Sequence, residues 1–155
     1  MMEKELKVSA IKNGTAIDRI PSNVLFKVIN ILGLQNCENQ ITFGMNLDSK
    51  KLGKKAIIKV TDRFFTPDEV NRIALIAPMA KLNIIRNYEV VEKREVEVPE
   101  ITENILKCIN PKCVTNHENI KTKFRKVSSE PLEMQCCYCE KYIDHEHFEI
   151  INNYE

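Results

Sequence analysis

The 155-residue sequence predicts an α+β fold in two domains, residues 1–98 and residues 101–155. In the first two thirds of the chain, short runs with the two-residue period of strands alternate with two runs of helical period. The last third has no convincing helical period and contains two close pairs of cysteines. Residues 92–99 are charged and end in proline, which is typical of a linker or a short connecting strand.

The first domain opens with two predicted strands, at residues 6–10 and 15–20, on either side of an Asn-Gly turn. The apolar side chains of residues 24–32 then recur with the spacing of one helical face. Gly33 follows at the position where a helix C-cap favours glycine. We therefore expect the first helix to end there.

Two further strands are predicted at residues 40–47, which alternate in polarity, and at residues 55–60, which are nearly all apolar. A second helix begins at Thr66, whose side chain can cap it, and Glu69 completes a capping box. A last strand at residues 82–91 closes the domain. The order β-α-β-β-α-β predicts a ferredoxin-like sandwich, in which both helices cover one face of the sheet.

The cysteines of the last third are spaced as Cys108-x4-Cys113 and Cys136-x2-Cys139. Four thiolates on two tight turns are the usual ligands of a tetrahedral, structural Zn²⁺. Disulfides would instead need an oxidising compartment, and residues 1–5 do not begin a secretory signal. We therefore expect one zinc ion per chain, in a small antiparallel-β domain of a reduced, cytoplasmic protein.

The other candidate ligands are expected to be spectators. Adjacent residues of an extended chain point to opposite faces, so Cys137 should lie outside the shell that its neighbours form. Cys37 lies far upstream and is expected to be a free thiol. Three histidines are predicted to be ordinary surface residues: His117, His145 and His147. A closed shell of four thiolates leaves no position for water or substrate, so the zinc should fold the domain and not catalyse.

The composition excludes several classes of protein. Hydrophobic residues make up 43% of the chain and charged residues 29%, which is typical of a soluble globular protein. No apolar stretch is long enough to span a bilayer. The four glycines are isolated, so no phosphate-binding glycine loop is present. With no nucleophile elbow and no open metal site either, the sequence gives no positive case for an enzyme.

A zinc ribbon that binds nucleic acid is the alternative function. The best basic run is residues 121–126, with one interleaved aromatic side chain. Residues 100–155, however, contain ten acidic and seven basic residues, and a zinc ion with four thiolates adds further negative charge. Neutralisation of phosphates is the main source of nucleic-acid affinity, so this domain would mostly repel nucleic acid.

Four segments together resemble the regulatory chain of aspartate carbamoyltransferase. They are residues 10–21 (AIKNGTAIDRIP), 75–78 (LIAP), 87–91 (NYEVV) and 136–141 (CCYCEK). The resemblance covers nearly the whole chain, and its first and last segments are the most specific. It implies a non-catalytic subunit with an N-terminal nucleotide-binding allosteric domain and a C-terminal zinc domain that contacts the catalytic chain.

The resemblance also implies partners and a role. Homodimers of regulatory chains would tie catalytic trimers together. CTP or ATP bound to the allosteric domain would shift the catalytic chains between low- and high-affinity states and so control the first committed step of pyrimidine biosynthesis. No nucleic-acid or membrane partner is implied.

The resemblance also implies a binding site for a nucleotide effector. Lys59 and Lys93 match positions that meet the phosphates, and Asp18 matches an acid near the ribose. Four further positions match those around the base: Ala10, Ile11, Tyr88 and Val90. Arg19 departs from the histidine of some members, and its permanent charge would strengthen triphosphate binding or alter effector preference. For Lys59 the alternative is an edge-strand lysine that discourages aggregation.

Overall fold

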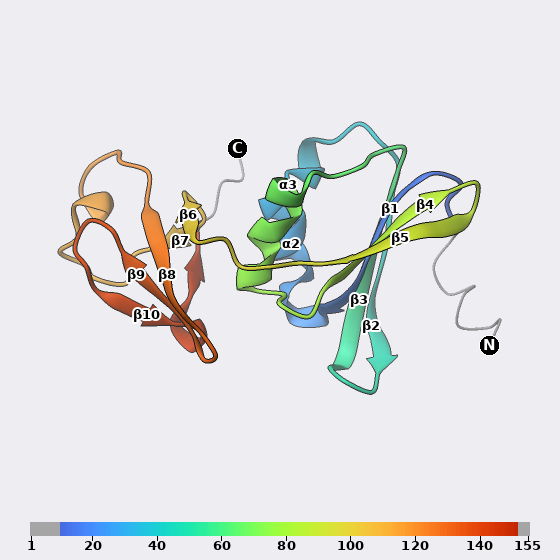
Figure 1. Cartoon of the computed structure of the whole chain (residues 1–155). Helices are drawn as coiled ribbons and strands as arrows, with labels where there is room; N and C mark the ends of the chain where they lie inside the picture. Colours follow the sequence, from blue (N-terminus) through green and yellow to red (C-terminus); the bar gives the residue numbers. More distant parts are fainter. Residues whose placement is uncertain (1–9, 152–155) are drawn as a thin grey trace. The chain divides into compact units, whose positions relative to one another are not determined.

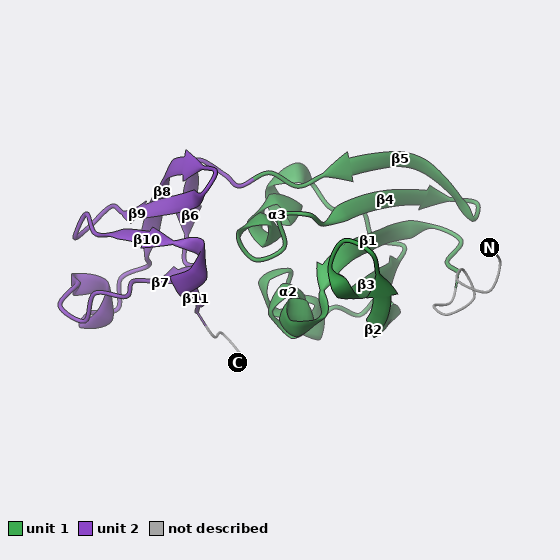
Figure 2. Ribbon diagram, turned by 90° about the horizontal axis from the view of Figure 1, so that it is seen from below, with its two compact units in different colours: residues 1–97 green, residues 98–155 purple. Residues whose placement is uncertain are grey.

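The computed structural model describes residues 10–151. The chain divides into two compact units, residues 1–97 and residues 98–155 (Figure 2). Each unit has its own sheet structure and its own buried apolar residues. Within the described residues, no helix has both the length and the apolar character that crossing a bilayer requires.

Unit 1, residues 1–97, contains an antiparallel sheet with the strand order β2-β3-β1-β4-β5 (Figure 1). Its strands are β1 (Gly14–Pro21), β2 (Ile41–Ser49), β3 (Gly53–Thr61), β4 (Lys81–Arg86) and β5 (Glu89–Glu95). Along the chain, β1 to β4 and the two helices follow the predicted order β-α-β-β-α-β of a ferredoxin-like sandwich. Strand β5 is added at the edge of the sheet. The predicted α+β class is therefore confirmed.

Two short helices lie on the same face of this sheet (Figures 1 and 2). They are α2 (Leu25–Ile31), between the 3₁₀ turns η1 (Ser22–Val24) and η2 (Leu34–Asn36), and α3 (Pro67–Asn71), which η3 (Arg72–Leu75) continues. Gly33 follows α2 in the left-handed conformation, with φ 68°, as expected of a C-cap glycine. The predicted capping box is also present, because Glu69 N–H donates to Thr66 Oγ1 and Thr66 N–H donates to Glu69 Oε1.

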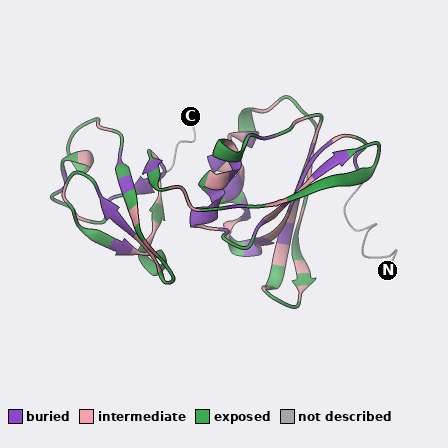
Figure 3. Cartoon of the chain, in the orientation of Figure 1, coloured by how far each residue is buried: buried purple, intermediate pink, exposed green. Residues whose placement is uncertain are grey.

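The core of unit 1 lies between the helices and the sheet (Figure 3). Leu25 and Val28 of α2 are fully buried at the spacing of one helical face. Ile58 and Val60 of β3 are fully buried at alternate positions. Each such side chain contributes about 1.5–3 kcal/mol by leaving water. Because successive strand residues point to opposite faces, Lys59 points away from this core.

One strand prediction for this unit is wrong in part. Residues 82–91 form a hairpin of two strands, and Asn87 (φ 52°) and Tyr88 (φ 68°) make its turn. The turn has Asn-Tyr in place of the Asn-Gly that signals such turns, so the sequence pattern continues through it. The second strand, β5, extends to residue 95, so of the two alternatives for residues 92–99, a linker or a short connecting strand, the strand is correct for residues 92–95.

Four other strands are predicted for unit 1, at residues 6–10, 15–20, 40–47 and 55–60. The strands predicted at residues 15–20, 40–47 and 55–60 are confirmed, with ends that differ by at most two residues. The strand predicted at residues 6–10 lies outside the described residues, apart from Ala10, which belongs to no strand.

Unit 2, residues 98–155, is antiparallel, as predicted, and has one sheet in the order β10-β9-β8-β6 and a second of β11 and β7. Its strands are β6 (Ile101–Glu103), β7 (Leu106–Lys107), β8 (Lys123–Ser129), β9 (Leu132–Cys136), β10 (Tyr142–Asp144) and β11 (Glu149–Ile150). Two 3₁₀ turns complete it, η4 (Val114–Asn116) and η5 (His145–His147). Phe124 and Met134 are fully buried at its centre.

Residues 143–151 alternate in polarity as one strand would, but they do not form a single strand. Asp144 Oδ1 accepts a hydrogen bond from Glu146 N–H at 3.0 Å and so caps η5, which interrupts the run. The chain after η5 pairs with β7 instead of continuing the larger sheet.

Candidate metal centre and effector face

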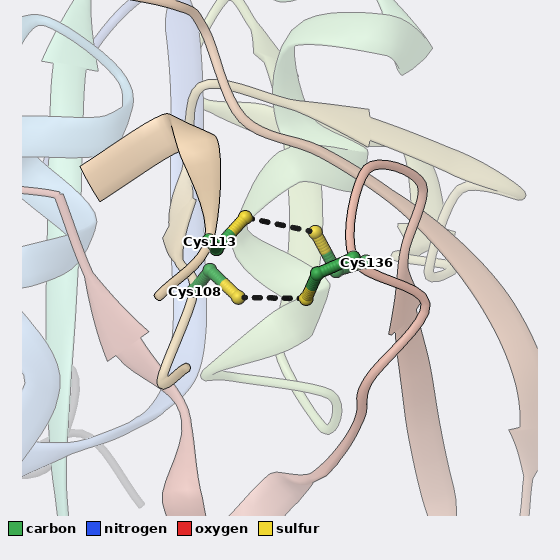
Figure 4. Close-up of side chains that lie close together, drawn as sticks. Cys108, Cys113 and Cys136 are labelled. Carbon is green, nitrogen blue, oxygen red and sulfur yellow. Dashed lines mark hydrogen bonds between the residues drawn. The ribbon is translucent and has the colours of Figure 1, made fainter. Parts of the chain in front are cut away.

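Four cysteines of unit 2 bring their sulfur atoms together (Figure 4). The sulfurs of Cys108, Cys113, Cys136 and Cys139 all lie within 4.8 Å of one another. The Cys108–Cys139 and Cys113–Cys136 pairs are separated by 3.6 and 3.8 Å. Four sulfurs about 2.3 Å from a central metal lie about 3.8 Å apart, whereas a disulfide needs about 2.05 Å. The four thiols are therefore positioned to hold a metal ion.

Two tight turns present these thiols. In the first turn, Cys113 N–H donates to Asn110 O at 3.0 Å, and Asn116 Nδ2 donates to both Cys108 O and Asn110 O. In the second, Cys136 ends β9, and the N–H four residues later donates to its carbonyl at 2.9 Å. Because backbone and amide hydrogen bonds close both turns, the ligands are largely pre-organised.

The surroundings of the thiols act on their pKa values in different directions. Burial raises the pKa of the Cys108 and Cys136 thiols. Burial also acts to raise the pKa of Cys139, but hydrogen bonds, the largest contribution coming from the Asn110 side chain, lower it to about 7. A bound cation would favour the thiolate form of every ligand. Soft thiolates in a closed tetrahedral shell fit Zn²⁺ and leave no position for a substrate.

The predicted spectators lie outside this cluster. Cys137 is exposed, and its N–H donates to Lys123 O at 2.9 Å. Cys37 belongs to the other unit, where its thiol contacts Asn39 Oδ1 at 3.1 Å. Three histidines are exposed: His117, His145 and His147. Among residues 10–151, these four cysteines are the only group of cysteine, histidine and acidic residues placed to hold a metal.

The two lysines predicted to meet phosphate lie in one row across the sheet of unit 1. Lys59 of β3 is directly opposite Ala16 of β1. Ala16 is in turn opposite Asn83 of β4, which is opposite Lys93 of β5. Residues that are directly opposite point to the same face, here the face away from the helices. Three strand spacings separate the two lysine Cα atoms by about 14 Å, so both long side chains can reach one phosphate chain.

Lys59 does not lie on an edge strand. β3 has a neighbour on each side, β2 and β1, so its backbone groups are already paired. The alternative explanation, an edge-strand lysine that discourages aggregation, is therefore wrong.

Asp18 lies on β1 close to the row of lysines. Its carboxylate oxygen Oδ1 is 3.0 Å from Lys55 Nζ. Partial burial lowers the pKa of Lys59, and the negative charge of Asp18 opposes that shift. A phosphate beside Lys59 would favour its charged form in the same way. This corner of the sheet therefore combines one carboxylate with several cations.

An apolar cluster continues the row towards the β4–β5 turn. Ile11, Ala16 and Ile85 pack together and are buried. Val90 is directly opposite Ile85, and Tyr88 lies on the adjoining turn. Both are exposed, Tyr88 at 67%. An apolar floor beside an exposed aromatic ring is a surface on which a nucleobase can stack.

The two remaining predicted positions flank this surface. Ala10 is exposed and directly precedes Ile11. Arg19 has φ 59°, at an irregularity in the pairing of β1 with β3, and its N–H donates to Asp18 Oδ1 at 2.6 Å. The irregularity turns the Arg19 side chain out of the alternation of the strand. Its direction therefore does not follow from the sequence pattern.

Sequence reasoning missed two residues of this face. Asn83 joins the row between the two lysines, and Lys55 pairs with Asp18. Lys55 had a usable signal, because it and Lys59 are spaced to share one face of a strand. Asn83 lies in a run with no distinguishing charge, so only the strand pairing reveals it.

Comparisons with known proteins match both parts of the chain to domains of the same family. Residues 6–97 match the family described as the aspartate carbamoyltransferase regulatory chain, allosteric domain. Residues 100–149 match the metal binding domain of the same chain.

Three similar proteins bear the name aspartate carbamoyltransferase regulatory chain. That of Pyrococcus horikoshii is 55% identical over 151 residues, covering 96% of this chain and 98% of the relative. That of Bacteroides fragilis is 52% identical over 149 residues, covering 96% and 97%. That of Porphyromonas gingivalis is 47% identical over 151 residues, covering 97% and 100%. The chain therefore belongs to the family of aspartate carbamoyltransferase regulatory chains, non-catalytic subunits with an allosteric domain and a metal-binding domain.

Proposed function

We propose that the chain binds CTP or ATP on the outer face of the unit 1 sheet and thereby regulates the first committed step of pyrimidine biosynthesis. The observation that supports nucleotide binding is the row that joins Lys59, Ala16, Asn83 and Lys93 across four strands. The chemistry itself would reside in the catalytic chain.

In this proposal each part of the face recognises one part of the nucleotide. Lys59 and Lys93 approach the phosphates from opposite ends of the row and supply charge-assisted hydrogen bonds. Asp18 accepts hydrogen bonds from the ribose hydroxyls. The base lies against Ile11 and Val90, beside Tyr88 and close to the backbone of Ala10. Arg19, at the edge, adds a further cation for the triphosphate.

The four cysteines would hold one structural Zn²⁺. The spacing of their sulfurs agrees with a tetrahedral shell of thiolates. Unit 2 has few fully buried large side chains, and a domain of this size buries too little apolar surface to be stable alone. Metal binding would therefore supply much of the free energy of folding of this unit.

The regulatory action follows from differential affinity. A nucleotide can shift the catalytic chains only if it binds one state of the complex more tightly than the other. The proposed assembly is the one implied by the family, in which regulatory homodimers join catalytic trimers in the cytoplasm. Unit 2 would contact the catalytic chain, and unit 1 would respond to the nucleotide.

The test is to mix the purified, zinc-loaded chain with its catalytic trimer. We expect gel filtration to show a larger complex, and the aspartate saturation curve of that complex to change when CTP or ATP is added. The chain alone should show no carbamoyl transfer. Comigration with RNA or DNA at moderate salt, together with no complex with the trimer, would contradict the proposal and favour a nucleic-acid-binding zinc ribbon.

A further inference from the structure

Two stretches of chain flank the apolar surface on which the base is proposed to lie. One is the segment that precedes β1, with Ala10 exposed and Ile11 buried. The other is the β4–β5 turn, which carries the exposed Tyr88. The pairing of β1 with β4 begins at Gly14 and Ile85, so both stretches extend beyond that ladder. Their separation therefore depends on contacts other than the pairing of these two strands.

Two hydrogen bonds join these stretches. Tyr88 N–H donates to Lys12 O at 2.9 Å. Asn87 N–H donates to Asn13 Oδ1 at 3.1 Å. The first bond involves backbone atoms alone, whereas the second depends on the side chain of Asn13. Asn13 is therefore the residue whose identity can strengthen or weaken this connection.

The turn has a conformation that its residues adopt with difficulty. Asn87 has φ 52° and Tyr88 has φ 68°. Two-residue hairpin turns with both residues left-handed favour glycine at the second position, because a Cβ is strained there. A strained conformation of this kind persists only when surrounding contacts hold it. The bond from Asn87 N–H to the Asn13 side chain supplies one such contact.

The Asn13 bond lies near the surface, which determines how its loss would act. Asn13 is half-buried and Asn87 is exposed. Water can therefore replace Asn13 Oδ1 when the side chain is shortened, and unit 1 should still fold. The turn would be held less firmly, however, and nucleotide binding would then have to order it. Ordering a loop on binding lowers affinity.

We propose that Asn13 is a positioning residue for the nucleotide base, because its side-chain oxygen holds the β4–β5 turn at a fixed distance from the segment before β1. This inference rests on the proposed function, since it assigns a residue to the base end of the same site. Asn13 acts through Tyr88 and does not itself contact the nucleotide. Lys59 and Lys93 belong to the row across the sheet, so the phosphate end does not depend on this bond.

The test is calorimetric titration of the zinc-loaded full chain with CTP, with ATP and with inorganic triphosphate, which lacks the base. Asn13→Ala should raise the Kd of CTP and of ATP about 2- to 10-fold, the effect of losing one neutral hydrogen bond. It should leave the Kd of inorganic triphosphate unchanged. The amide of Asn87 should also exchange its hydrogen faster in this variant, as measured by NMR.

The matched control is Asn71→Ala. Asn71, at the end of α3, accepts the same kind of bond, because Glu97 N–H donates to its Oδ1 at 3.1 Å. Loss of that bond should leave the Kd of all three ligands unchanged, since it lies in another part of unit 1.

A double-mutant cycle tests whether Asn13 acts through Tyr88. In a chain that already carries Tyr88→Ala, Asn13→Ala should raise the Kd of CTP by less than about 1.5-fold, because no ring is left to position. The same loss of affinity with and without the Tyr88 ring would overturn the inference.

The outcomes distinguish this inference from the proposed function. A wild-type chain that binds none of the three ligands contradicts the proposed function itself. Nucleotide binding by the wild type that Asn13→Ala leaves unchanged overturns the inference alone. So does an equal loss of affinity for inorganic triphosphate, because Asn13 would then support the whole unit and not the base end of the site.

Discussion

Replacement of Lys59 by alanine tests the effector face most directly. The variant loses a charge-assisted contact with phosphate, which contributes about 1–3 kcal/mol, so the Kd for nucleotide should rise by about 5- to 150-fold. The effect should lie towards the upper end, because Lys59 is partly buried on an inner strand and Asp18 would then repel the phosphates more strongly. Lys93→Ala should cost less, since Lys93 is exposed on the edge strand and solvent screens its charge.

The assay is calorimetric titration of CTP and ATP into each zinc-loaded variant. Lys27→Ala is the matched control, because Lys27 is an exposed lysine of α2, on the helix side of the sheet, and its loss should leave Kd unchanged. Zinc content should be equal in all variants, since both effector lysines belong to unit 1. Unchanged affinity in both Lys59→Ala and Lys93→Ala would refute the effector site.

The dependence of binding on pH gives a second readout of the same contact. Burial lowers the pKa of Lys59 below the ordinary 10.5, and phosphate binds the protonated form. Nucleotide affinity should therefore be fully present below the pKa of the free protein and fall as pH rises through it. That fall should begin at a lower pH than an ordinary lysine would give, and Lys59→Ala should abolish it. An identical pH profile in the variant would show that Lys59 does not meet the phosphates.

Three further predictions concern other parts of the chain. Cys136→Ser should lose zinc, and chelation of zinc should unfold unit 2 selectively, whereas Cys137→Ser should keep one zinc per chain by atomic absorption; the reverse pattern would overturn the ligand assignment. Gly14→Ala should destabilise unit 1 by about 1–3 kcal/mol in urea unfolding, because φ is +142° and a Cβ would lie 2.1 Å from Val60 O; a change too small to measure would contradict the conformation of β1. Arg19→His should change the ratio of the CTP and ATP dissociation constants and leave the zinc content unchanged; an unchanged ratio would show that Arg19 does not select between the effectors.

Local chemistry made much of this protein predictable from its sequence. The sequence predicts the cysteine cluster because its ligands come in two close pairs, so each turn is a local feature. The capping box at Thr66 and the C-cap at Gly33 likewise depend on neighbours within a few residues. The strands β1 and β2 follow from the alternation of apolar residues, which a half-buried sheet imposes, and β3 follows from a nearly continuous apolar run.

The resemblance to a family supplied what the pattern of residues could not. The pattern around Lys59 left an edge-strand lysine open, and Lys93 is unremarkable in its charged segment. The match of the whole chain to regulatory-chain domains is what identifies the chain as a non-catalytic subunit.

Only the tertiary structure decided how distant segments meet. The hairpin at Asn87 and Tyr88 needs two left-handed residues, which Lys12 O and the Asn13 side chain support from another part of the chain. The row that joins Lys59 to Lys93 depends on strand register, which fixes facing residues through pairing across the sheet. Local sequence determines what each segment can become, whereas the burial of shared apolar faces determines which segments lie side by side, and the proposed effector face arises from that second step.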